Sequence, residues 1–217
     1  MKKFELTNEF VTNMFGTKLF RIRALVEFGD VEAGELGGYV EKESNLGHDD
    51  NAWVYDNAWV YGNARVSGDA LVYGNARVSG NAQVFGNARV SGNARVYGNA
   101  RVYGDAQVSG DALVYDNAWV YGDAQVSGDA LVCGDARVCG DARVCGNGDY
   151  AYAHGFGSVN RTTTFFRLKD GGVGVRCGCF YGTLAQFRDK IRETHGETKK
   201  AQEYLMLADL MKLRFEK

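Results

Sequence analysis

Proline is absent from the 217 residues, and no apolar stretch is long enough to cross a bilayer. A proline inside a strand would remove a donor from the hydrogen-bond ladder, so its absence suits a continuous stack of strands. The N-terminus lacks the pattern of a secretory signal peptide. Five cysteines fit a reducing compartment better than a disulfide scaffold. These features predict a cytoplasmic protein without a membrane segment.

Charge of one sign is also lacking, because the formal net charge is −2. This balance gives no overall case for binding nucleic acid or a membrane surface. The distribution is uneven, since residues 147–217 carry twelve basic against eight acidic residues. We therefore expect a mildly basic C-terminal piece.

One six-residue sequence, Asn/Asp-Ala-x-Val-y-Gly, repeats sixteen times from Asn51 to Gly146. Ala and Val lie two positions apart, so they project from the same side of an extended strand, and the residue between them projects from the other side. Gly followed by Asn or Asp accepts left-handed backbone angles at low cost. Each unit therefore predicts one short strand and one corner. Three units would close a triangular coil, and coils would stack at about 4.8 Å.

The array resembles the hexapeptide-repeat family of left-handed parallel β-helices, in which a small residue stands four positions after an aliphatic one. Val66 is followed by Ala70, and Val72 by Ala76, at that spacing. The glycine differs, because it follows the valine by two positions rather than one. Bactofilin-like right-handed β-helices, which form cytoskeletal polymers, look similar at this level. The resemblance implies an all-β protein with a triangular, left-handed parallel β-helix, and right-handed winding is the alternative.

Non-repeating segments flank the array and predict caps over the ends of the stack, which would otherwise polymerise. Residues 1–28 predict an N-terminal β cap with a hairpin near Gly16, and residues 29–148 predict the β-helix, in which Val31, Leu36, Val40 and Leu46 of an irregular first coil point inward. Residues 149–217 predict a C-terminal α+β domain that caps the rod, oligomerises or binds a ligand. In that domain 149–157 breaks the six-residue repeat, 162–169 and 173–181 are strands, and two helices follow. Thr183 with Gln186 forms a capping box, and the second helix turns Ala201, Leu205, Ala208 and Met211 inward.

The order of two strands and two helices ending at Phe215 resembles a tail found on hexapeptide-repeat proteins of bacteriophages and prophages. The stretch from Leu19 through Gly37-Gly38-Tyr39 resembles the same group, most of which has no assigned function. The resemblance implies a protein that acts in the cytoplasm of a bacterial host cell.

Residues eighteen apart should form columns along each face of the rod, such as Leu71, Arg89 and Gln107. Outward aromatic side chains cover sheet faces, and exposed aromatic patches also mark interfaces. The interface candidates are Trp59, Arg77, Arg95, Leu113, Trp119 and Tyr121. The C-terminal basic residues form the candidate group for a partner or an anionic ligand, namely Arg161, Arg167, Lys169, Arg176, Lys199 and Lys200.

The sequence offers little catalytic chemistry, since the array contains none of the three histidines. Hexapeptide-repeat acyltransferases use a histidine base, which leaves His154 or His195 in an end pocket as the remaining candidates. Cys133, Cys139 and Cys145 are six apart, so they should lie on three faces and not share a metal. Cys177 and Cys179 should share one face of a strand and pack in the core. We expect no metal and no cofactor.

Three functions follow from these features. The first is a non-catalytic rod for assembly and protein binding, in the form of a homotrimer or other homo-oligomer. A specialised form is a phage inhibitor of bacterial defence that binds a host immune protein or a nucleotide signal. The alternatives are a bactofilin-like polymer and an acyltransferase. Nucleic acid and membrane are not expected partners.

Overall fold

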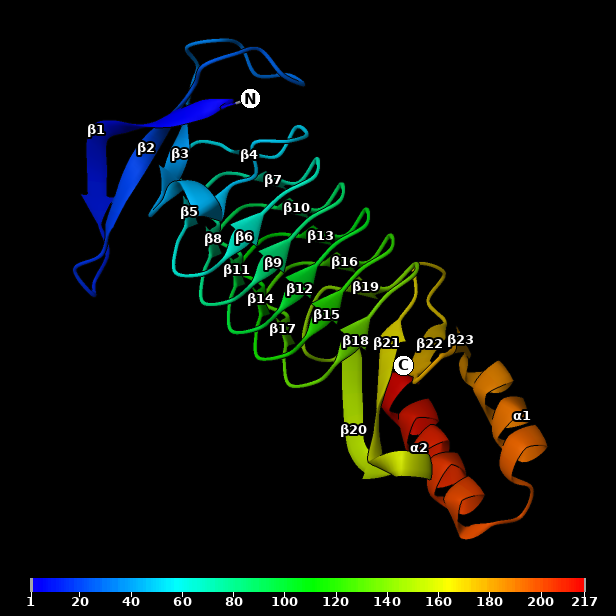
Figure 1. Ribbon diagram of the computed structural model, residues 1–217. Coiled ribbons are helices and arrows are strands. Elements are labelled where there is room, and N and C mark those ends of the chain that lie inside the picture. The colour runs from blue at the N-terminus through cyan, green and yellow to red at the C-terminus, as the bar shows by residue number, and fades with distance from the viewer. Residues whose placement is uncertain (1, 217) are drawn as a thin grey trace.

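The computed structural model describes residues 2–216 and shows a solenoid with a β hairpin at one end and an α+β unit at the other (Figure 1). Each hexapeptide unit forms one two-residue strand at its x-Val positions. The sixteen strands are β4 (Trp53–Val54), β5 (Trp59–Val60), β6 (Arg65–Val66), β7 (Leu71–Val72), β8 (Arg77–Val78), β9 (Gln83–Val84), β10 (Arg89–Val90), β11 (Arg95–Val96), β12 (Arg101–Val102), β13 (Gln107–Val108), β14 (Leu113–Val114), β15 (Trp119–Val120), β16 (Gln125–Val126), β17 (Leu131–Val132), β18 (Arg137–Val138) and β19 (Arg143–Val144).

Successive strands turn onto three different sheets, so every third strand is a neighbour. The three stacks are β4-β7-β10-β13-β16-β19, β5-β8-β11-β14-β17 and β6-β9-β12-β15-β18. Pairing is parallel, and Arg89 lies between Leu71 and Gln107 as the eighteen-residue period predicted. The predicted parallel, three-sided coil is thereby confirmed.

Alanine and valine of each unit fill the interior. Ala64, Val66 and their equivalents along the array are fully buried, whereas the residue between them faces outward. Burying a valine side chain stabilises the fold by roughly 1.5–2 kcal/mol. The small alanine leaves room for the chain to turn within a narrow coil.

Glycine ends most units because the corner backbone is left-handed and tightly stacked. Gly68 has φ of +68°, and a Cβ there would lie 2.9 Å from the backbone nitrogen of Gly86 in the next coil. Asp56 and Asp116 replace glycine at two corners, with φ of 52° and 58°. The Asp56 carboxylate accepts a hydrogen bond from the Gly74 N–H at 2.9 Å, so the aspartate corner is tied to the coil that follows.

The N-terminal cap extends one solenoid sheet instead of forming a separate lid. Strands β1 (Phe4–Thr12) and β2 (Lys18–Ala24) form an antiparallel hairpin, as predicted, and β3 (Leu36–Val40) joins β2 to β5. A short 3-10 helix, η1 (Glu43–Asn45), follows. Trp53 is fully buried beneath Phe4 and Phe28.

One expected core residue of the first coil is exposed. Val31, Val40 and Leu46 are buried as predicted, but Leu36 is 47% exposed. The β2–β3 register shifts between Arg21 and Arg23, so the strand is irregular beside Leu36 and strict alternation fails. Gly37, rather than Leu36, lies against the core. A side chain at position 37 would place its Cβ 2.6 Å from Ile22.

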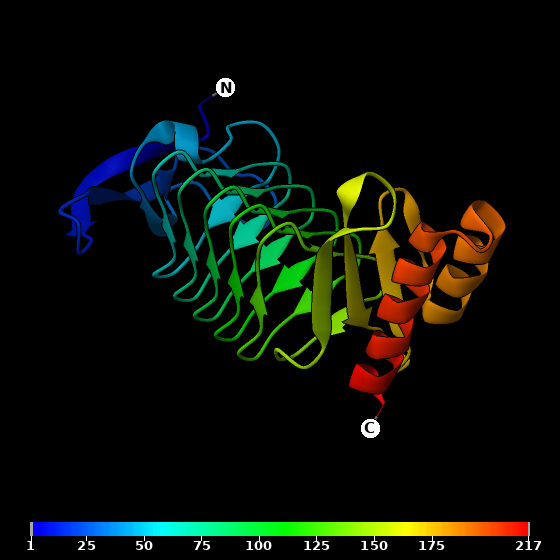
Figure 2. The same ribbon diagram turned by 90° about the horizontal axis from the view of Figure 1, so that it is seen from below.

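The C-terminal unit is a four-stranded antiparallel sheet with two helices on the side away from the solenoid (Figure 2). Its elements are β20 (Tyr150–Phe156), η2 (Ser158–Asn160), β21 (Arg161–Arg167), β22 (Val173–Cys177), β23 (Phe180–Thr183), α1 (Leu184–His195) and α2 (Lys199–Phe215). Neighbouring residues of β21 face opposite ways. Phe166 packs with the solenoid core and Phe165 with the helices. The Thr183–Gln186 capping box is confirmed.

The structure adds to the expectations for this unit and corrects one of them. Residues 149–157, where only a break in the repeat was expected, contain strand β20. The single strand expected over 173–181 is two strands, β22 and β23, because a turn at Gly178 and Cys179 reverses the chain. In α2, Ala201, Ala208 and Met211 are buried as predicted, and Leu205 is partly buried against the same core, to which Tyr204 also contributes.

Candidate functional site

The stack β6-β9-β12-β15-β18 carries most of the arginine and aromatic side chains that lie side by side on the rod. Its outward column is Arg65, Gln83, Arg101, Trp119 and Arg137. The Trp119 ring lies between two guanidinium groups, with Arg101 at 5.0 Å and Arg137 at 4.7 Å from its centroid. Cation–π contacts of this kind hold long side chains in one arrangement.

A second column on this stack consists of aromatic rings that lie face to face. Phe85 and Tyr103 are 4.9 Å apart with planes 1° from parallel, and Tyr103 and Tyr121 are 4.9 Å apart and 2° from parallel. Burial raises the pKa of both tyrosines, so their hydroxyls remain neutral near pH 7. We call the two columns together the aromatic–arginine face.

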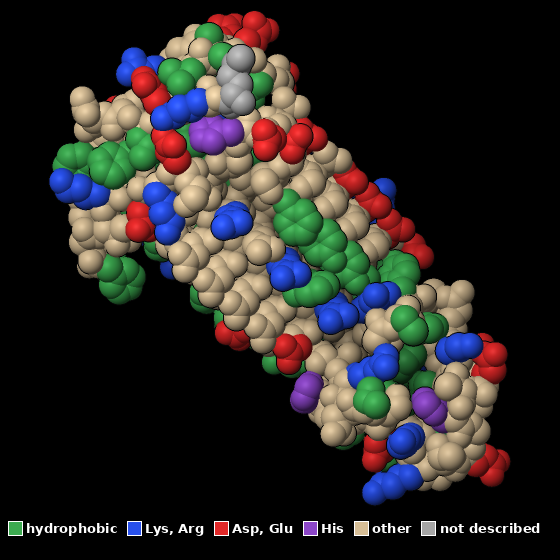
Figure 3. All heavy atoms as spheres, viewed as in Figure 1, with side chains coloured by type: hydrophobic (Ala, Val, Ile, Leu, Met, Phe, Trp, Pro, Cys, Tyr) green, Lys and Arg blue, Asp and Glu red, His purple; other side chains and the backbone are tan. Residues whose placement is uncertain are grey.

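Arg176 of β22 extends this face into the C-terminal unit. It pairs in register with Thr164, whose Oγ1 accepts a hydrogen bond from the Arg137 N–H at 2.9 Å. The positive charge of Arg176 opposes the rise in pKa that burial causes at Cys139, which follows Tyr121 in the ring column. Figure 3 shows a hydrophobic band along the rod with arginine and lysine side chains beside it.

The six basic residues predicted as one binding group lie apart. Arg176 belongs to the aromatic–arginine face, and Arg161 lines two cavities near the Gly178 turn. Arg167 stabilises the fold, because its guanidinium donates to the carbonyls of Phe215 and Gly171 at 3.1 Å. The remaining three are exposed at other places, namely Lys169 after β21 and Lys199 and Lys200 at the start of α2.

The six interface candidates lie on two faces of the rod. Trp59, Arg77, Arg95 and Leu113 form one column on β5, β8, β11 and β14, where the Arg77 guanidinium lies 4.5 Å from the Trp59 ring centroid. Trp119 and Tyr121 belong to the aromatic–arginine face. The columns confirm the eighteen-residue spacing, but that spacing alone did not show that the arginine and ring columns meet at Trp119 and Tyr103, whose ring centroids are 6.2 Å apart.

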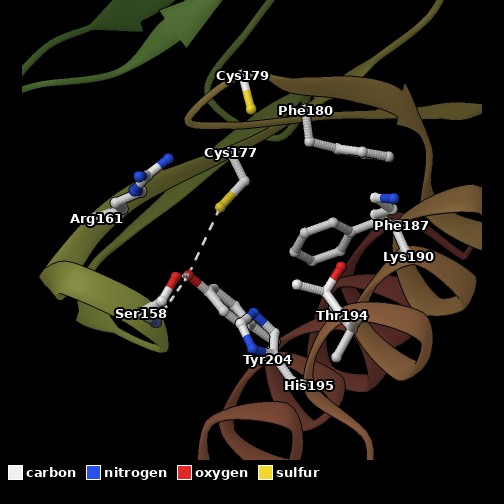
Figure 4. Close-up of a pocket in the computed structure, with 11 residues that line it drawn as sticks. Ser158, Arg161, Cys177, Cys179, Phe180, Phe187, Lys190, Thr194, His195 and Tyr204 are labelled. Atoms are coloured by element: carbon white, nitrogen blue, oxygen red, sulfur yellow. Dashed lines mark hydrogen bonds between the residues drawn. The ribbon is translucent and has the colours of Figure 1, made fainter.

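The C-terminal unit holds a cavity of about 200 Å³ between η2, the Gly178 turn and both helices. Phe180, Phe187 and Ile191 form its apolar wall, and Arg161 and Lys190 add positive charge (Figure 4). Cys177 and Cys179 line the same cavity. This cavity was not predicted from the sequence, because its walls come from segments up to forty-six residues apart.

One hydrogen-bonded network crosses this cavity. The Cys177 Sγ accepts a hydrogen bond from the Thr163 hydroxyl at 3.2 Å, and its thiol donates to the Tyr204 hydroxyl oxygen at 3.8 Å. The Ser158 N–H donates to the same tyrosine oxygen at 3.1 Å. Burial raises the pKa of Tyr204, although contact with Ser158 opposes the rise.

The three histidines lie at separate places. His48 stacks on Phe4 with 4.4 Å between ring centroids, and its Nδ1 accepts a hydrogen bond from the Lys3 N–H. His154 lies 2.8 Å from the Thr162 hydroxyl at the edge of an open cavity. His195 stacks on Tyr204 at 5.9 Å beside the cavity that holds the cysteines. No two of them approach one another in these contacts.

The cysteines of the array lie on three different sheets, as predicted. In the described part of the chain, no group of three or more histidine, cysteine, aspartate or glutamate side chains is placed to hold a metal ion. Cys177 and Cys179 do not share a strand, since Cys177 ends β22 and Cys179 lies in the turn. Within residues 2–216, no helix is long and apolar enough to cross a membrane.

Comparison with known families identifies the array. Six segments match the model of the YdcK beta solenoid repeat, namely residues 58–74, 70–84, 82–96, 94–106, 106–122 and 124–140. The protein is a β-solenoid repeat protein. Among curated proteins, none gives a significant match to the chain. The matched segments span the coils that carry the aromatic–arginine face.

Proposed function

We propose that this β-solenoid is a non-catalytic binding protein that holds an acidic protein partner on its aromatic–arginine face. The observation that carries the proposal is the composition of that face. Its two columns contain Arg65, Arg101 and Arg137 with stacked aromatic rings and no carboxylate, and Arg176 adds a further positive charge at the end. Arginine, tyrosine and tryptophan dominate the binding energy of protein interfaces.

The geometry of the stacked rings favours a protein rather than a nucleic acid as the partner on this face. Single-stranded nucleic acids bind when their bases stack on exposed aromatic faces. In the Phe85-Tyr103-Tyr121 column each ring covers the face of its neighbour, so mainly ring edges and hydroxyls are available. Ring edges suit apolar side chains, while the arginines suit carboxylates. A second copy docked face to face would bring like charges together.

The likeness to phage proteins narrows the proposal to a host immune protein in the cytoplasm of a bacterial cell as the partner. A nucleotide signal is less favoured, because the six basic residues do not form one group. A polymer is less favoured because non-repeating segments cover both ends of the stack. An acyltransferase is less favoured because His154 and His195 lie in separate cavities without a second histidine beside them.

Charge reversal on two matched faces tests the proposal. Arg101→Glu with Arg137→Glu changes the aromatic–arginine face, and Arg77→Glu with Arg95→Glu makes the same change at the same repeat positions on another face. We expect the first pair to weaken capture of the partner from host lysate at least about 100-fold, since each charged contact contributes roughly 1.5–3 kcal/mol. The second pair should bind as the unaltered protein does.

Equal binding by both variants would contradict the proposal. The narrower hypothesis has its own test, in which the protein is expressed in hosts that carry antiphage defences. We expect phage plating to rise with the unaltered protein and not with the Arg101→Glu, Arg137→Glu variant. Unchanged plating on every defended host would refute the anti-defence role and leave the binding face untouched.

A further inference from the structure

We infer that Cys177 and Cys179 form a redox-active dithiol that exchanges with low-molecular-weight disulfides entering the cavity of the C-terminal unit. The two thiols line one cavity that is open to solvent (Figure 4). This site is independent of the aromatic–arginine face and of the function proposed for it.

The turn brings the two cysteines within disulfide range. Cys177 ends β22, and the two-residue turn to β23 consists of Gly178, with φ of +59°, and Cys179. Two residues of extended chain span about 6.6 Å, and a turn shortens that span. A disulfide needs about 4.4–6.8 Å between Cα atoms. The Cα spacing therefore permits a Cys177–Cys179 bond once the Cys177 side chain rotates away from Tyr204.

Hydrogen-bonding groups and positive charge lie around the Cys177 sulfur. The Thr163 hydroxyl already donates to its sulfur at 3.2 Å. After the thiol loses its proton, the Tyr204 hydroxyl can turn to donate to the same sulfur, and the raised pKa of that tyrosine keeps it protonated. The Arg161 guanidinium lies against the turn. If residue 178 carried a side chain, its Cβ would lie only 1.9 Å from Nη1 of Arg161. Donors and positive charge of this kind activate cysteines.

The cavity limits the size of the substrate. A volume of about 200 Å³ admits part of a small disulfide and excludes a folded redox protein from reaching Cys177. The Arg161 and Lys190 side chains at its wall suit the carboxylates of a peptide disulfide such as oxidised glutathione.

The exchange proceeds in two balanced steps. The Cys177 thiolate attacks one sulfur of the small disulfide, so a mixed disulfide forms and one small thiolate leaves. Cys179 then loses its proton, attacks the Cys177 sulfur and expels the second small thiolate. The protein loses two electrons and two protons, and the disulfide becomes two thiols.

Glutathione redox buffers followed by alkylation and mass spectrometry test the inference on the whole protein. Trypsin releases residues 177–188 as one peptide that contains both cysteines and no others. We expect this peptide to lose two hydrogens and resist alkylation, while exposed Cys145 forms only a mixed disulfide or stays reduced. A peptide alkylated at both positions under conditions that modify Cys145 would overturn the inference.

Tyr204→Phe tests whether the Tyr204 hydroxyl assists the reaction of the Cys177 sulfur, because the substitution keeps the buried ring and removes only the hydroxyl. We expect oxidation of the peptide to slow about fivefold, the factor that corresponds to one ordinary hydrogen bond. Tyr152→Phe is the matched control, since Tyr152 lies outside the cavity lining. An unchanged rate for Tyr204→Phe, with the fold preserved by circular dichroism, would show that the network does not activate Cys177.

Discussion

The N-terminal end of the solenoid presents mainly backbone carbonyls and the C-terminal end mainly backbone N–H groups. Parallel strands exchange bonds in both directions, but the bonds between coils that involve a residue outside the strands run one way, as the Arg65 N–H donates to the Ala82 carbonyl of the following coil. The first coil therefore leaves mostly carbonyls without a partner in an earlier coil, and the last leaves mostly N–H groups without a partner in a later one. Unpaired buried groups of either kind are costly.

The side chains that cover the two ends have opposite chemistry. At the N-terminal end, the Asn45 amide donates to the carbonyls of Gly62 and Ala64, and the Lys3 ammonium donates to those of Asp50 and Ala52. At the C-terminal end, the covering side chains act as hydrogen-bond acceptors. The receiving oxygens are the side chains of Asn147, Asp149 and Thr164, which bind the N–H groups of Leu131, Cys145 and Arg137. A parallel stack thus needs a different cap at each end, and the caps cannot be exchanged.

Asn45→Ala should produce the largest loss if this comparison holds. The fully buried amide makes bonds of 3.2 Å and 2.8 Å to two carbonyls and accepts one of 2.9 Å from the Lys42 N–H. We expect unfolding in urea to show a loss of about 3 kcal/mol, since several buried groups lose their partners. Asn63→Ala, at an exposed corner, should cost under about 0.5 kcal/mol. Similar losses for both would mean that the end carbonyls need no cap.

Lys3→Met should change how stability depends on pH. Burial lowers the pKa of Lys3 from 10.5 to about 8, although nearby aspartates oppose this shift. Between those two values the unfolded chain binds more protons than the folded one, so stability rises with pH in that window. We expect a rise of about 2 kcal/mol between pH 8 and 10.5 that Lys3→Met removes. A curve that is the same in both proteins would contradict a buried, donating Lys3.

Thr164→Val tests the acceptor end with the smallest expected effect. The substitution keeps the shape of a buried side chain and leaves the Arg137 N–H without its 2.9 Å partner. We expect a loss of about 1–2 kcal/mol in urea unfolding. Thr162→Val is the matched control, because its hydroxyl meets only the exposed His154, and it should change stability by under about 0.5 kcal/mol. Equal losses for the two substitutions would mean that the Arg137 N–H does not depend on the Thr164 hydroxyl.

The repeat alone was enough to predict the solenoid, the inward position of Ala and Val and the outward columns. All three features follow from the six-residue period. The exceptions lie where repetition stops. Leu36 is exposed because of an irregular strand pairing, and β20 was missed because glycines around Tyr150–Phe156 break its pattern. Such features depend on pairing between distant segments.

The candidate sites also contain one part that the repeat period predicts and one part that depends on packing between distant segments. The Arg101, Trp119 and Arg137 column followed from the eighteen-residue period, but its contact with the ring column, between Trp119 and Tyr103, depends on side-chain packing. The cavity at Cys177 could not be predicted at all. It requires the Gly178 turn, Ser158 and Tyr204 to meet, and they come from three separate elements.

Photo-crosslinking from matched glutamines tests the binding face most directly. Gln83 lies outward on the aromatic–arginine face, and Gln107 occupies the same repeat position on another face. A photoreactive phenylalanine analogue at each position, activated in host cells, should crosslink an acidic protein from position 83 and nothing from position 107. Crosslinks of equal yield from both positions, or from position 107 alone, would contradict a partner held on the aromatic–arginine face.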